Sequence, residues 1–519
     1  MTGSVFSRLR RSAERHADLP ALEVDGRVWT YGGLFALADR LAAAVSAAAP
    51  GCRRVGLLTN RGLAGYVGYL AALRCGAAAV PLSPAAPAAR NRWICASAAV
   101  EVVVADGSGD LDAVLAGTGT PRLVLSGDWP DRLPAGRITA VRATGDDLAY
   151  LMSTSGSTGT PKCVPVRHRH VLPFLDFALR QRPVGPGDRF AQNFELTFDL
   201  CSYNLFVAWT AGATVVSTTT RDVLSPAAFV TAHRITHWYS VPSVVSLADR
   251  LDAVPAGSMP SLRYSLFCGE PLTVDQARTW AAAAPASELW NIYGPTELVM
   301  TCAEYRLPRD TGRWPATTNG TVPIGAVYPH LDGVLLAADG AVSTVEGSAD
   351  GELCVRGPQR FDGYLDPSAD AGRFVEVRDG RAVDVTGPVR REHWYRTGDV
   401  VRVEPSGYLV HHGRVDHQVK IRGHRVELAE IEAVLRTHPA VRESVVLAVP
   451  AVDGDVDLHA WFAGPDADPH GLADTVAAHL PDHMRPHAYH HRDPLPRNAN
   501  GKVDRALLLT EATGGVHNG

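Results

Sequence analysis

The stretch Ser153-Thr-Ser-Gly-Ser-Thr-Gly-Thr-Pro-Lys162 is the most informative part of the sequence, and it follows a short apolar run, Leu148-Ala-Tyr-Leu-Met152. Hydroxyl side chains and two glycines fill the stretch, which closes on a proline and a lysine. Backbone N–H and side-chain O–H donors in such a loop can hold phosphate oxygens, and Lys162 would neutralise their charge. The spacing differs from that of a Walker A loop. A flexible Ser/Gly linker is the structural alternative, but linkers rarely follow a buried apolar run and end in Pro-Lys.

Helical and extended segments alternate on both sides of this loop. Residues 34–47 and 63–73 have apolar residues three and four positions apart, which predicts helices. Short apolar runs at 54–58, 77–81 and 102–105 predict buried strands between the helices. Strands that alternate with helices predict an α/β fold with mainly parallel sheets.

The pattern changes near position 400, where short strands joined by glycine turns replace the long helices. The predicted elements are strands at 398–404, 407–410, 415–419 and 441–449 and a charged amphipathic helix at 427–437. This pattern is typical of a small α+β domain that follows a large α/β body. We therefore predict an N-terminal domain at 1–414 and a C-terminal domain at 415–519, with a frayed tail after Arg505.

Composition limits the class of protein. The 519 residues are 46% hydrophobic and 20% charged, which is enough apolar material for large cores and excludes a disordered or fibrous protein. The net charge of −5 gives no indication of a nucleic-acid or membrane partner. The eight cysteines contain no Cys-x-x-Cys pair, and no signal peptide or run of about 18 apolar residues is found. We expect a soluble, cytoplasmic protein without a disulfide framework or a zinc site.

Four further segments carry side chains suited to nucleotide chemistry. Asn291-Ile-Tyr-Gly-Pro-Thr-Glu297 predicts a turn that presents Tyr293 to a flat base, Thr296 to a phosphate and Glu297 to a divalent metal. Arg396-Thr-Gly-Asp399 places a carboxylate at a turn, where it could accept both ribose hydroxyls. Residues 413–423 combine several basic side chains with one acid, and Asn498-Ala-Asn-Gly-Lys502 presents one lysine from a loop. Taken singly, each segment also has an ordinary explanation as a structural turn, a solvated hairpin or a surface lysine.

Together and in this order, the five segments resemble the adenylation enzymes, a family of acyl- and aryl-CoA synthetases, luciferases and adenylation domains of nonribosomal peptide synthetases. Further matches extend along the chain: Trp29-Thr-Tyr-Gly-Gly-Leu34, Leu73-Arg-Cys-Gly-Ala-Ala-Ala-Val-Pro-Leu82, Gly351-Glu-Leu-Cys-Val-Arg-Gly357, Gly363-Tyr-Leu365 and Tyr395-Arg-Thr-Gly-Asp399. Phe267-Cys-Gly-Glu270 and residues 423–432 are most similar to stand-alone D-alanine–carrier-protein ligases and freestanding synthetase adenylation domains. Two positions depart from the family pattern, because Cys163 replaces the usual glycine after Pro-Lys and Thr160 replaces a basic residue.

The resemblance implies an enzyme with a large N-terminal domain of stacked sheets and helices and a small mobile C-terminal domain that rotates about Asp416. It also implies that ATP and Mg²⁺ bind, that an acyl-AMP forms with release of pyrophosphate, and that the acyl group then passes to a thiol. The catalytic residues it implies are Lys162, Thr296, Glu297 (the metal ligand) and Lys502. The implied nucleotide-binding residues are Thr154, Ser155, Gly156, Ser157, Thr158, Gly159, Gly269, Glu270, Asn291, Ile292, Tyr293, Gly294, Thr296, Asp399, His411, Arg414 and Lys502.

Phe198-Asp199-Leu-Cys-Ser-Tyr203 indicates the substrate. In amino-acid-activating members of the family, the Asp after this Phe pairs with the α-ammonium group; the alternative is that Asp199 is the N-cap of a helix at 200–210. The resemblance implies a pocket lined by Asp199, Leu200, Tyr203, Ser240, Leu266, Cys268, Ile292, Met300 and Thr301 and closed by Lys502. This lining has no second charge and little free volume, which favours a small neutral α-amino acid: alanine first, then serine, cysteine or proline.

The acceptor of the activated group is expected to be a separate protein. No carrier domain with a phosphopantetheine site follows Lys502, so the thiol would come from a carrier protein in trans or from coenzyme A, and Asp199 favours the carrier protein. The main alternative is an acyl- or aryl-CoA ligase in which Asp199 is only a helix cap. A catalytically silent nucleotide-binding protein is a third possibility, against which Lys162, Glu297 and Lys502 argue.

Overall fold

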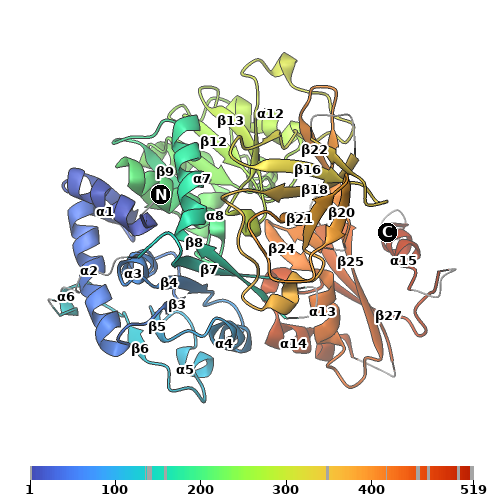
Figure 1. Cartoon of the computed structure of the whole chain (residues 1–519), viewed down its shortest axis with the longest axis horizontal. Coiled ribbons are helices and arrows are strands. Elements are labelled where there is room, and N and C mark those ends of the chain that lie inside the picture. The colour runs from blue at the N-terminus through green and yellow to red at the C-terminus, as the bar shows by residue number, and fades with distance from the viewer. Residues whose placement is uncertain are drawn as a thin grey trace. The chain divides into compact units, whose positions relative to one another are not determined.

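The computed structural model describes residues 3–134, 136, 143–156, 160–345, 350–416, 418–451, 456–464, 468–498 and 503–514 (Figure 1). The chain divides into two compact units. Unit 1 comprises Met1–Pro84, Cys95–Met152 and Cys163–Val415, and unit 2 comprises Ala85–Ile94, Ser153–Lys162 and Asp416–Gly519. Two short segments from the first half of the chain therefore group with the C-terminal part, which the sequence did not predict. Within the described ranges, no helix combines the length and apolarity needed to cross a bilayer.

A six-stranded sheet forms one part of unit 1. Its strands are β3 (Arg54–Leu58), β4 (Ala78–Leu82), β5 (Val102–Ala105), β6 (Arg122–Val124), β7 (Leu148–Thr154) and β8 (Lys162–Arg167), in the order β6-β5-β3-β4-β7-β8. The pairs from β6 to β7 are parallel. β4 and β5 are buried at every residue, as expected for strands covered on both faces. The predicted strands at 54–58, 77–81 and 102–105 are thus confirmed to within one residue.

A nine-stranded sheet carries five of the predicted site residues on its strands. Its strands are β1 (Pro20–Val24), β2 (Arg27–Thr30), β9 (Arg189–Gln192), β10 (Thr214–Ser217), β11 (His237–Ser240), β12 (Tyr264–Phe267), β13 (Glu288–Tyr293), β14 (Ala303–Arg306) and β15 (Ala326–Val327), in the order β15-β14-β13-β12-β11-β9-β10-β1-β2. The central pairs from β1 through β10, β9, β11 and β12 to β13 are parallel. Their carboxyl ends therefore meet at one edge, where ligand-binding loops of open α/β sheets lie.

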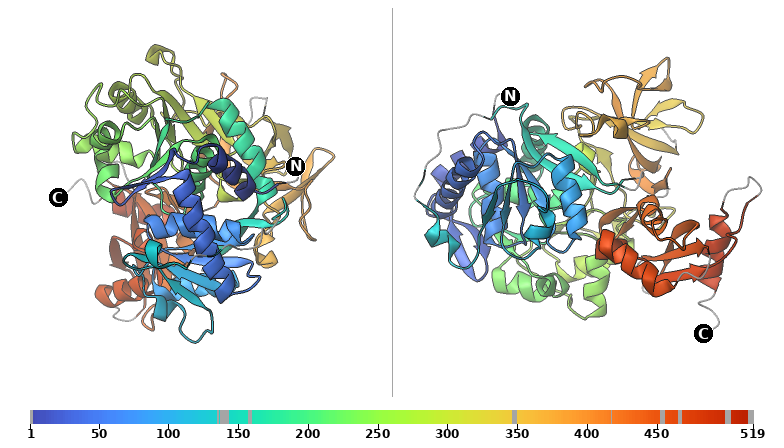
Figure 2. Two further views of the ribbon diagram at one scale, coloured as in Figure 1. Left: turned by 90° about the vertical axis from the view of Figure 1, so that its left-hand side faces the viewer. Right: turned by 90° about the horizontal axis from the view of Figure 1, so that it is seen from below.

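The helices of this part of the chain belong to unit 1, except that residues 88–94 of one helix belong to unit 2. They are α1 (Val5–Arg15), α2 (Tyr31–Ala48), α3 (Leu63–Arg74), α4 (Ala88–Ser97), α5 (Leu111–Val114), α6 (Trp129–Arg132), α7 (His168–Gln181), α8 (Asp199–Ala211), α9 (Thr220–Leu224), α10 (Pro226–His233), α11 (Ser243–Arg250) and α12 (Val274–Ala283). α1 packs against α2, α7 and α8 (Figure 2). The first eleven residues of α8 are all buried, which agrees with its largely apolar sequence and makes it a core helix.

A seven-stranded antiparallel sheet completes unit 1. Its strands are β16 (Asp332–Leu336), β17 (Val342–Thr344), β18 (Asp350–Arg356), β19 (Phe374–Arg378), β20 (Arg381–Asp384), β21 (Trp394–Val403) and β22 (Leu409–Arg414). The pairing of β21 with β22 places Asp399 directly opposite Arg414. The strand predicted at 415–419 begins later than expected, as Gln418–Ile421, because the chain bends at residues 415 and 416 after β22 ends at Arg414.

The C-terminal part of unit 2 is a small α+β structure, as predicted. It contains the hairpin β23 (Gln418–Ile421) and β24 (His424–Glu427), the sheet of β25 (Glu443–Pro450), β26 (Val456–Ala463) and β27 (Ala488–His491), and the helices α13 (Leu428–Leu435), α14 (Pro469–His479) and α15 (Arg505–Gly514). α13 and α14 share a core with one face of β25 and β26. The tail predicted to fray after Arg505 instead forms α15, because Leu508 is buried in a cluster with Val445 and Trp461.

Candidate active site

Asp199 is a buried carboxylate at the start of α8. The helix begins at Asp199 itself, and the preceding Phe198 occupies the N-cap position without a side-chain cap. Asp199 Oδ2 accepts a hydrogen bond from the Met300 amide at 3.2 Å. Burial raises the pKa of this carboxyl to about 6, against the opposing effect of hydrogen bonds from Thr296 and the backbone. In the described part of the chain, no basic side chain forms an ion pair with Asp199.

The turn that supplies the Met300 amide has an unusual backbone. Val299 and Met300 both have positive φ values, 57° and 69°, in the left-handed region. This conformation is unfavourable for residues with a side chain and most of all for a β-branched one, and such strain concentrates at functional sites. The turn follows β13 and the 3₁₀ helix η1 (Thr296–Leu298). Gly294 is required here, since a Cβ atom would lie 2.5 Å from the Cα of Thr301.

Most of the predicted pocket residues lie in one buried cluster with the turn. The members that were predicted from the sequence are Leu200, Tyr203, Leu266, Cys268, Ile292 and Met300. Thr301 is fully buried beside them, and its hydroxyl lies 2.7 Å from the hydroxyl of Tyr328. Tyr203 stands four residues after Asp199 on α8, so both side chains are on one helix face. These predicted residues therefore belong to the large hydrophobic core of unit 1, which also contains Val299 and Met300 of the turn.

Ser240 is a buried residue at the end of β11. Its hydroxyl accepts a hydrogen bond from Trp238 Nε1 at 3.0 Å, and Trp238 belongs to a different core. The neighbouring Tyr239, which was not predicted, pairs in register with Leu266, and its ring lies 5.1 Å from that of Tyr203. Side chains alternate between faces along a strand, so an offset of one residue exchanges the two faces. Only the register of β11 against β12 could have identified Tyr239.

Glu297, the predicted metal ligand, is fully buried in η1. Its Oε1 atom accepts a hydrogen bond from the Tyr364 hydroxyl at 2.6 Å, and its carbonyl oxygen accepts one from the Phe361 amide at 2.9 Å. Tyr364 was quoted for its resemblance to the family but was not predicted to touch the site. The contact depends on a fold that brings together residues far apart in sequence.

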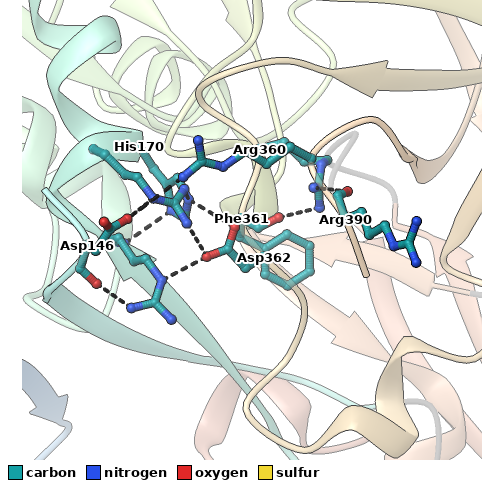
Figure 3. A network of polar contacts seen from close by, with 9 residues as sticks. Asp146, His170, Arg360, Phe361, Asp362 and Arg390 are labelled. Carbon is teal, nitrogen blue, oxygen red and sulfur yellow. Dashed lines mark hydrogen bonds and ion pairs between the residues drawn. The ribbon is translucent and has the colours of Figure 1, made fainter. Parts of the chain in front are cut away.

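A network of ion pairs fixes the segment that carries Tyr364 (Figure 3). Asp362 accepts a hydrogen bond from Arg167 Nε at 2.7 Å and also pairs with Arg169, while His170 Nε2 lies 3.5 Å from its Oδ1. Burial alone would raise the pKa of Asp362, but the hydrogen bonds and charges of these partners lower it well below its usual range. Arg167 and His170 flank the start of α7, so the network ties the Tyr364 segment to the residues that follow β8.

Asp399 is the centre of a second group of predicted residues. Its side chain accepts hydrogen bonds from the Tyr293 hydroxyl at 2.5 Å and from Arg414 Nη1 at 2.6 Å, and His411 Nε2 lies 3.2 Å away. Asp399 is only 4% exposed. Four residues predicted to bind the nucleotide thus meet where β13, β21 and β22 approach each other.

Other predicted nucleotide-binding residues occupy the ends of β12 and β13. Asn291 Nδ2 donates to the carbonyl oxygens of Val322 and Pro323 at 3.0 and 2.9 Å. Glu270 accepts hydrogen bonds from the amide and hydroxyl of Ser243 at 2.9 and 3.2 Å. Gly269 has a φ of 95°, which few other residues adopt.

The described part of the phosphate loop belongs to unit 2, and its residue Thr154 is also the last residue of β7. A Cβ atom on Gly156 would lie 1.8 Å from the Thr160 carbonyl oxygen, so only glycine fits there. Within unit 2, Ser155 Oγ donates to the Arg425 carbonyl at 2.7 Å, and the Gly156 amide donates to Glu430 at 3.1 Å. Lys162 is the first residue of β8. The predicted residues Ser157, Thr158, Gly159 and Lys502 lie outside the described residues.

Comparison with known proteins identifies the family. Residues 9–365 match the family of AMP-binding enzymes, and residues 430–502 match the AMP-binding enzyme C-terminal domain. An L-proline–[L-prolyl-carrier protein] ligase of Streptomyces coelicolor is 35% identical over 98% of this chain and 97% of that protein. The crystal structure of IdnL7 is 37% identical with a TM-score of 0.71, over 99% of this chain and 100% of that one. The Vibrio cholerae adenylation domain AlmE, solved with glycyl-adenosine-5'-phosphate, is 26% identical with a TM-score of 0.84, over 99% and 98% of the two chains. The chain therefore belongs to the AMP-binding enzyme family.

Proposed function

We propose that this protein uses ATP to activate a small neutral α-amino acid and then transfers it to the phosphopantetheine thiol of a separate carrier protein. In the first step, the substrate carboxylate attacks the α-phosphorus of ATP, which forms aminoacyl-AMP and releases pyrophosphate. The carboxylate is already ionised at neutral pH, so no general base is required. In the second step, the thiol sulfur attacks the acyl carbon, and AMP leaves as the thioester forms.

The buried carboxylate of Asp199 is the observation that carries this proposal. An ionised group without a cationic partner is costly inside a protein, and a substrate ammonium would supply the missing charge. Fatty and aryl acids have no group that could do so. The amide of Met300 occupies one side of the carboxylate, which leaves an acceptor for the ammonium group of an amino acid.

The size of the pocket supports a small substrate. Tyr203, Ile292 and Met300, which we assign to the pocket together with Asp199, have large side chains, and none of them carries a charge at neutral pH. Alanine is our first choice, followed by serine, cysteine and proline. The named substrates of the compared proteins, L-proline and the glycyl group of glycyl-AMP, are likewise small and uncharged. Hydrophobic pockets discriminate by only ~1–3 kcal/mol per methylene, so a ranking among these substrates needs measurement.

We assign the binding and activation of ATP to charged and polar groups around the pocket. We assign Asp399 to the ribose hydroxyls, the loop at 154–162 with Lys162 to the phosphates, and Lys502 to the reacting carboxylate and α-phosphate. Glu297 and the hydroxyl of Thr296 fit a Mg²⁺ site, because this ion binds through one or two carboxylates together with substrate phosphates, whose charge it would neutralise. Positioning and charge neutralisation are sufficient for this reaction class.

An ATP–pyrophosphate exchange assay tests the proposal. A panel should contain the proteinogenic amino acids and the deaminated acid of each active one. We expect exchange with small neutral amino acids, none with propionate, and a loss of exchange in Asp199→Ala. Asp176→Ala, which removes a partly exposed carboxylate from α7, is the matched control and should retain exchange. Exchange with propionate that survives Asp199→Ala would favour the acyl- or aryl-CoA ligase instead.

Two further measurements address the catalytic lysine and the acceptor. We expect Lys502→Ala to reduce exchange by about 10²–10³-fold, the usual effect of removing one electrostatic partner of a transition state. Labelled amino acid should appear on a phosphopantetheinylated carrier protein but not on its unmodified form, and not as a coenzyme A thioester. Transfer to coenzyme A alone would contradict the carrier-protein assignment.

A further inference from the structure

A buried ion pair lies behind the predicted pocket, formed by Arg182 and Glu304. Arg182 directly follows α7 and is 1% exposed. Its Nη1 atom donates to Glu304 Oε2 at 2.9 Å, and 9% of the Glu304 side chain is exposed. An apolar pair of similar volume is often as stable as a buried ion pair, or more so, because two charges lose their hydration. A contribution to folding stability therefore does not by itself explain these two residues.

Arg182 also holds a residue of the pocket. Its Nε atom donates to the hydroxyl of Tyr203 at 3.2 Å. The Tyr203 ring is 2% exposed and packs edge-on against the rings of Tyr239 at 5.1 Å and Phe174 at 5.8 Å. The aromatic rings confine the body of the Tyr203 side chain, while Arg182 fixes its hydroxyl end.

Glu304 in turn connects Arg182 to the opposite wall of the pocket. Glu304 on β14 pairs in register with Ile292 on β13, which is a predicted lining residue. The guanidinium of Arg182 lies 4.8 Å from the ring of Trp290, two residues earlier on β13. Among the described residues, Nη2 of Arg182 finds no hydrogen-bond partner. The guanidinium therefore depends on Glu304 and Tyr203 for its polar contacts, and it spans the distance between the sheet and α8.

We propose that Arg182 and Glu304 are specificity-determining positioning residues, which hold the Tyr203 ring across the side-chain end of the amino-acid pocket. This proposal rests on the proposed function, since it assumes that Asp199 binds the α-ammonium group. Tyr203 is one helical turn beyond Asp199, ~6 Å along the axis of α8. That spacing accommodates a methyl group, a hydroxymethyl group or a compact ring, but not a long branched or aromatic side chain. Turning the Tyr203 ring aside would break its bond to Arg182 and leave a second buried N–H group without a partner.

The test compares substrate selectivity in two variants that release Tyr203 without removing its ring. Tyr203→Phe deletes the hydroxyl alone. The double variant Arg182→Met/Glu304→Leu replaces both charges together, so no unpaired charge remains in the core. For each protein, kcat/KM in pyrophosphate exchange is measured with the best small amino acid and with leucine, methionine and phenylalanine. We expect the preference for the small substrate over leucine to fall at least tenfold in both variants, while the KM for ATP stays within twofold of the wild-type value.

Tyr69→Phe is the matched control. The Tyr69 hydroxyl is also buried and also contacts α8, through Ser202 Oγ at 3.1 Å, but it is not part of the chain of contacts from Glu304 to Tyr203. Its selectivity should equal that of the wild type, and an equal loss of selectivity in this control would overturn the proposal. A thermal melt shows which variants fold. If the double variant does not fold, the selectivity of Tyr203→Phe alone tests the proposal.

The outcomes separate this inference from the proposed function. If the wild-type protein catalyses pyrophosphate exchange with no amino acid, the proposed function and the proposed role of Arg182 and Glu304 are both rejected. If the wild type catalyses exchange but the selectivity of Tyr203→Phe stays within threefold of the wild-type value, only the proposed role of Arg182 and Glu304 is rejected.

Discussion

The buried carboxylate of Asp199 would stabilise a bound amino acid, but its charge destabilises the folded protein. Its pKa is raised from 3.8 to about 6 by burial, so above pH 6 the charged carboxylate lowers the free energy of unfolding by ~3 kcal/mol. This penalty disappears as the pH falls toward 3.8, where the folded and unfolded states both hold the proton. We expect Asp199→Asn to raise the free energy of unfolding by ~1–3 kcal/mol at pH 7.5 and to gain little at pH 4.5. Urea denaturation at the two pH values measures the difference, and a variant less stable than wild type at pH 7.5 would contradict it.

The same carboxyl predicts how amino-acid activation depends on pH. Only the ionised form attracts an ammonium group, so kcat/KM for the amino acid should fall as the pH drops below about 6, approaching tenfold per pH unit. The KM for ATP, measured at saturating amino acid, should change much less over that range. Exchange assays between pH 5 and 8 give both parameters. A flat profile for the amino acid would indicate that Asp199 does not bind the ammonium group.

At the scale of elements, the segment between β18 and β19 positions the carboxylate of η1. Tyr364 donates to Glu297 at 2.6 Å, and hydrogen bonds to charged groups contribute about 1.5–3 kcal/mol. We expect Tyr364→Phe to reduce exchange by roughly tenfold, in line with that range, and to raise the Mg²⁺ concentration that gives half-maximal activity. Mg²⁺ titration of the exchange rate measures the effect. Tyr408→Phe, at a 39% exposed tyrosine, is the control, and an unchanged Mg²⁺ dependence in Tyr364→Phe would contradict the prediction.

At the scale of the whole molecule, the peptide between Val415 and Asp416 is one of the points where the chain passes from unit 1 to unit 2, and it precedes the C-terminal part of unit 2. If the C-terminal domain rotates about Asp416 between the two half-reactions, Asp416→Pro should impair only one of them, because proline fixes φ and restricts the preceding residue. We expect pyrophosphate exchange within about threefold of wild type and thioester formation at least tenfold slower, consistent with a conformational step before transfer. Asp416→Ala, which leaves the backbone free to rotate, should retain both activities. Equal losses of both activities in Asp416→Pro would contradict the hinge assignment.

The family and the α/β fold could be predicted from the sequence because they depend on local signals. Hydrophobic periodicity located β3, β5 and α2, and short motifs such as Asn291–Glu297 identified the family. Contacts between distant segments left no such signal. The pairing of Asp399 with Arg414 depends on the register of β21 and β22, and the pairing of Tyr239 with Leu266 depends on that of β11 and β12.

The ion pair of Arg182 and Glu304 behind the predicted pocket could not be predicted, for the same reason. Arg182 follows a helix and Glu304 stands on a short strand next to the edge of its sheet, and charged side chains at such positions are usually at the surface. Only their burial in the folded chain identifies them as a pair. Leu508 shows the same limit at the C-terminus, where packing against β25 and β26 makes a helix of a stretch that looks like a tail.

The left-handed turn at Val299 and Met300 has a consequence for engineering new selectivity. Met300 is an obvious target for randomisation. Its φ of 69°, however, favours glycine and asparagine, whichever substrate the pocket binds. In a library at this codon, selection for soluble clones would enrich those two residues before any catalytic screen began. The frequency of glycine and asparagine would then reflect the backbone conformation at this position. It could be mistaken for a substrate preference of the pocket.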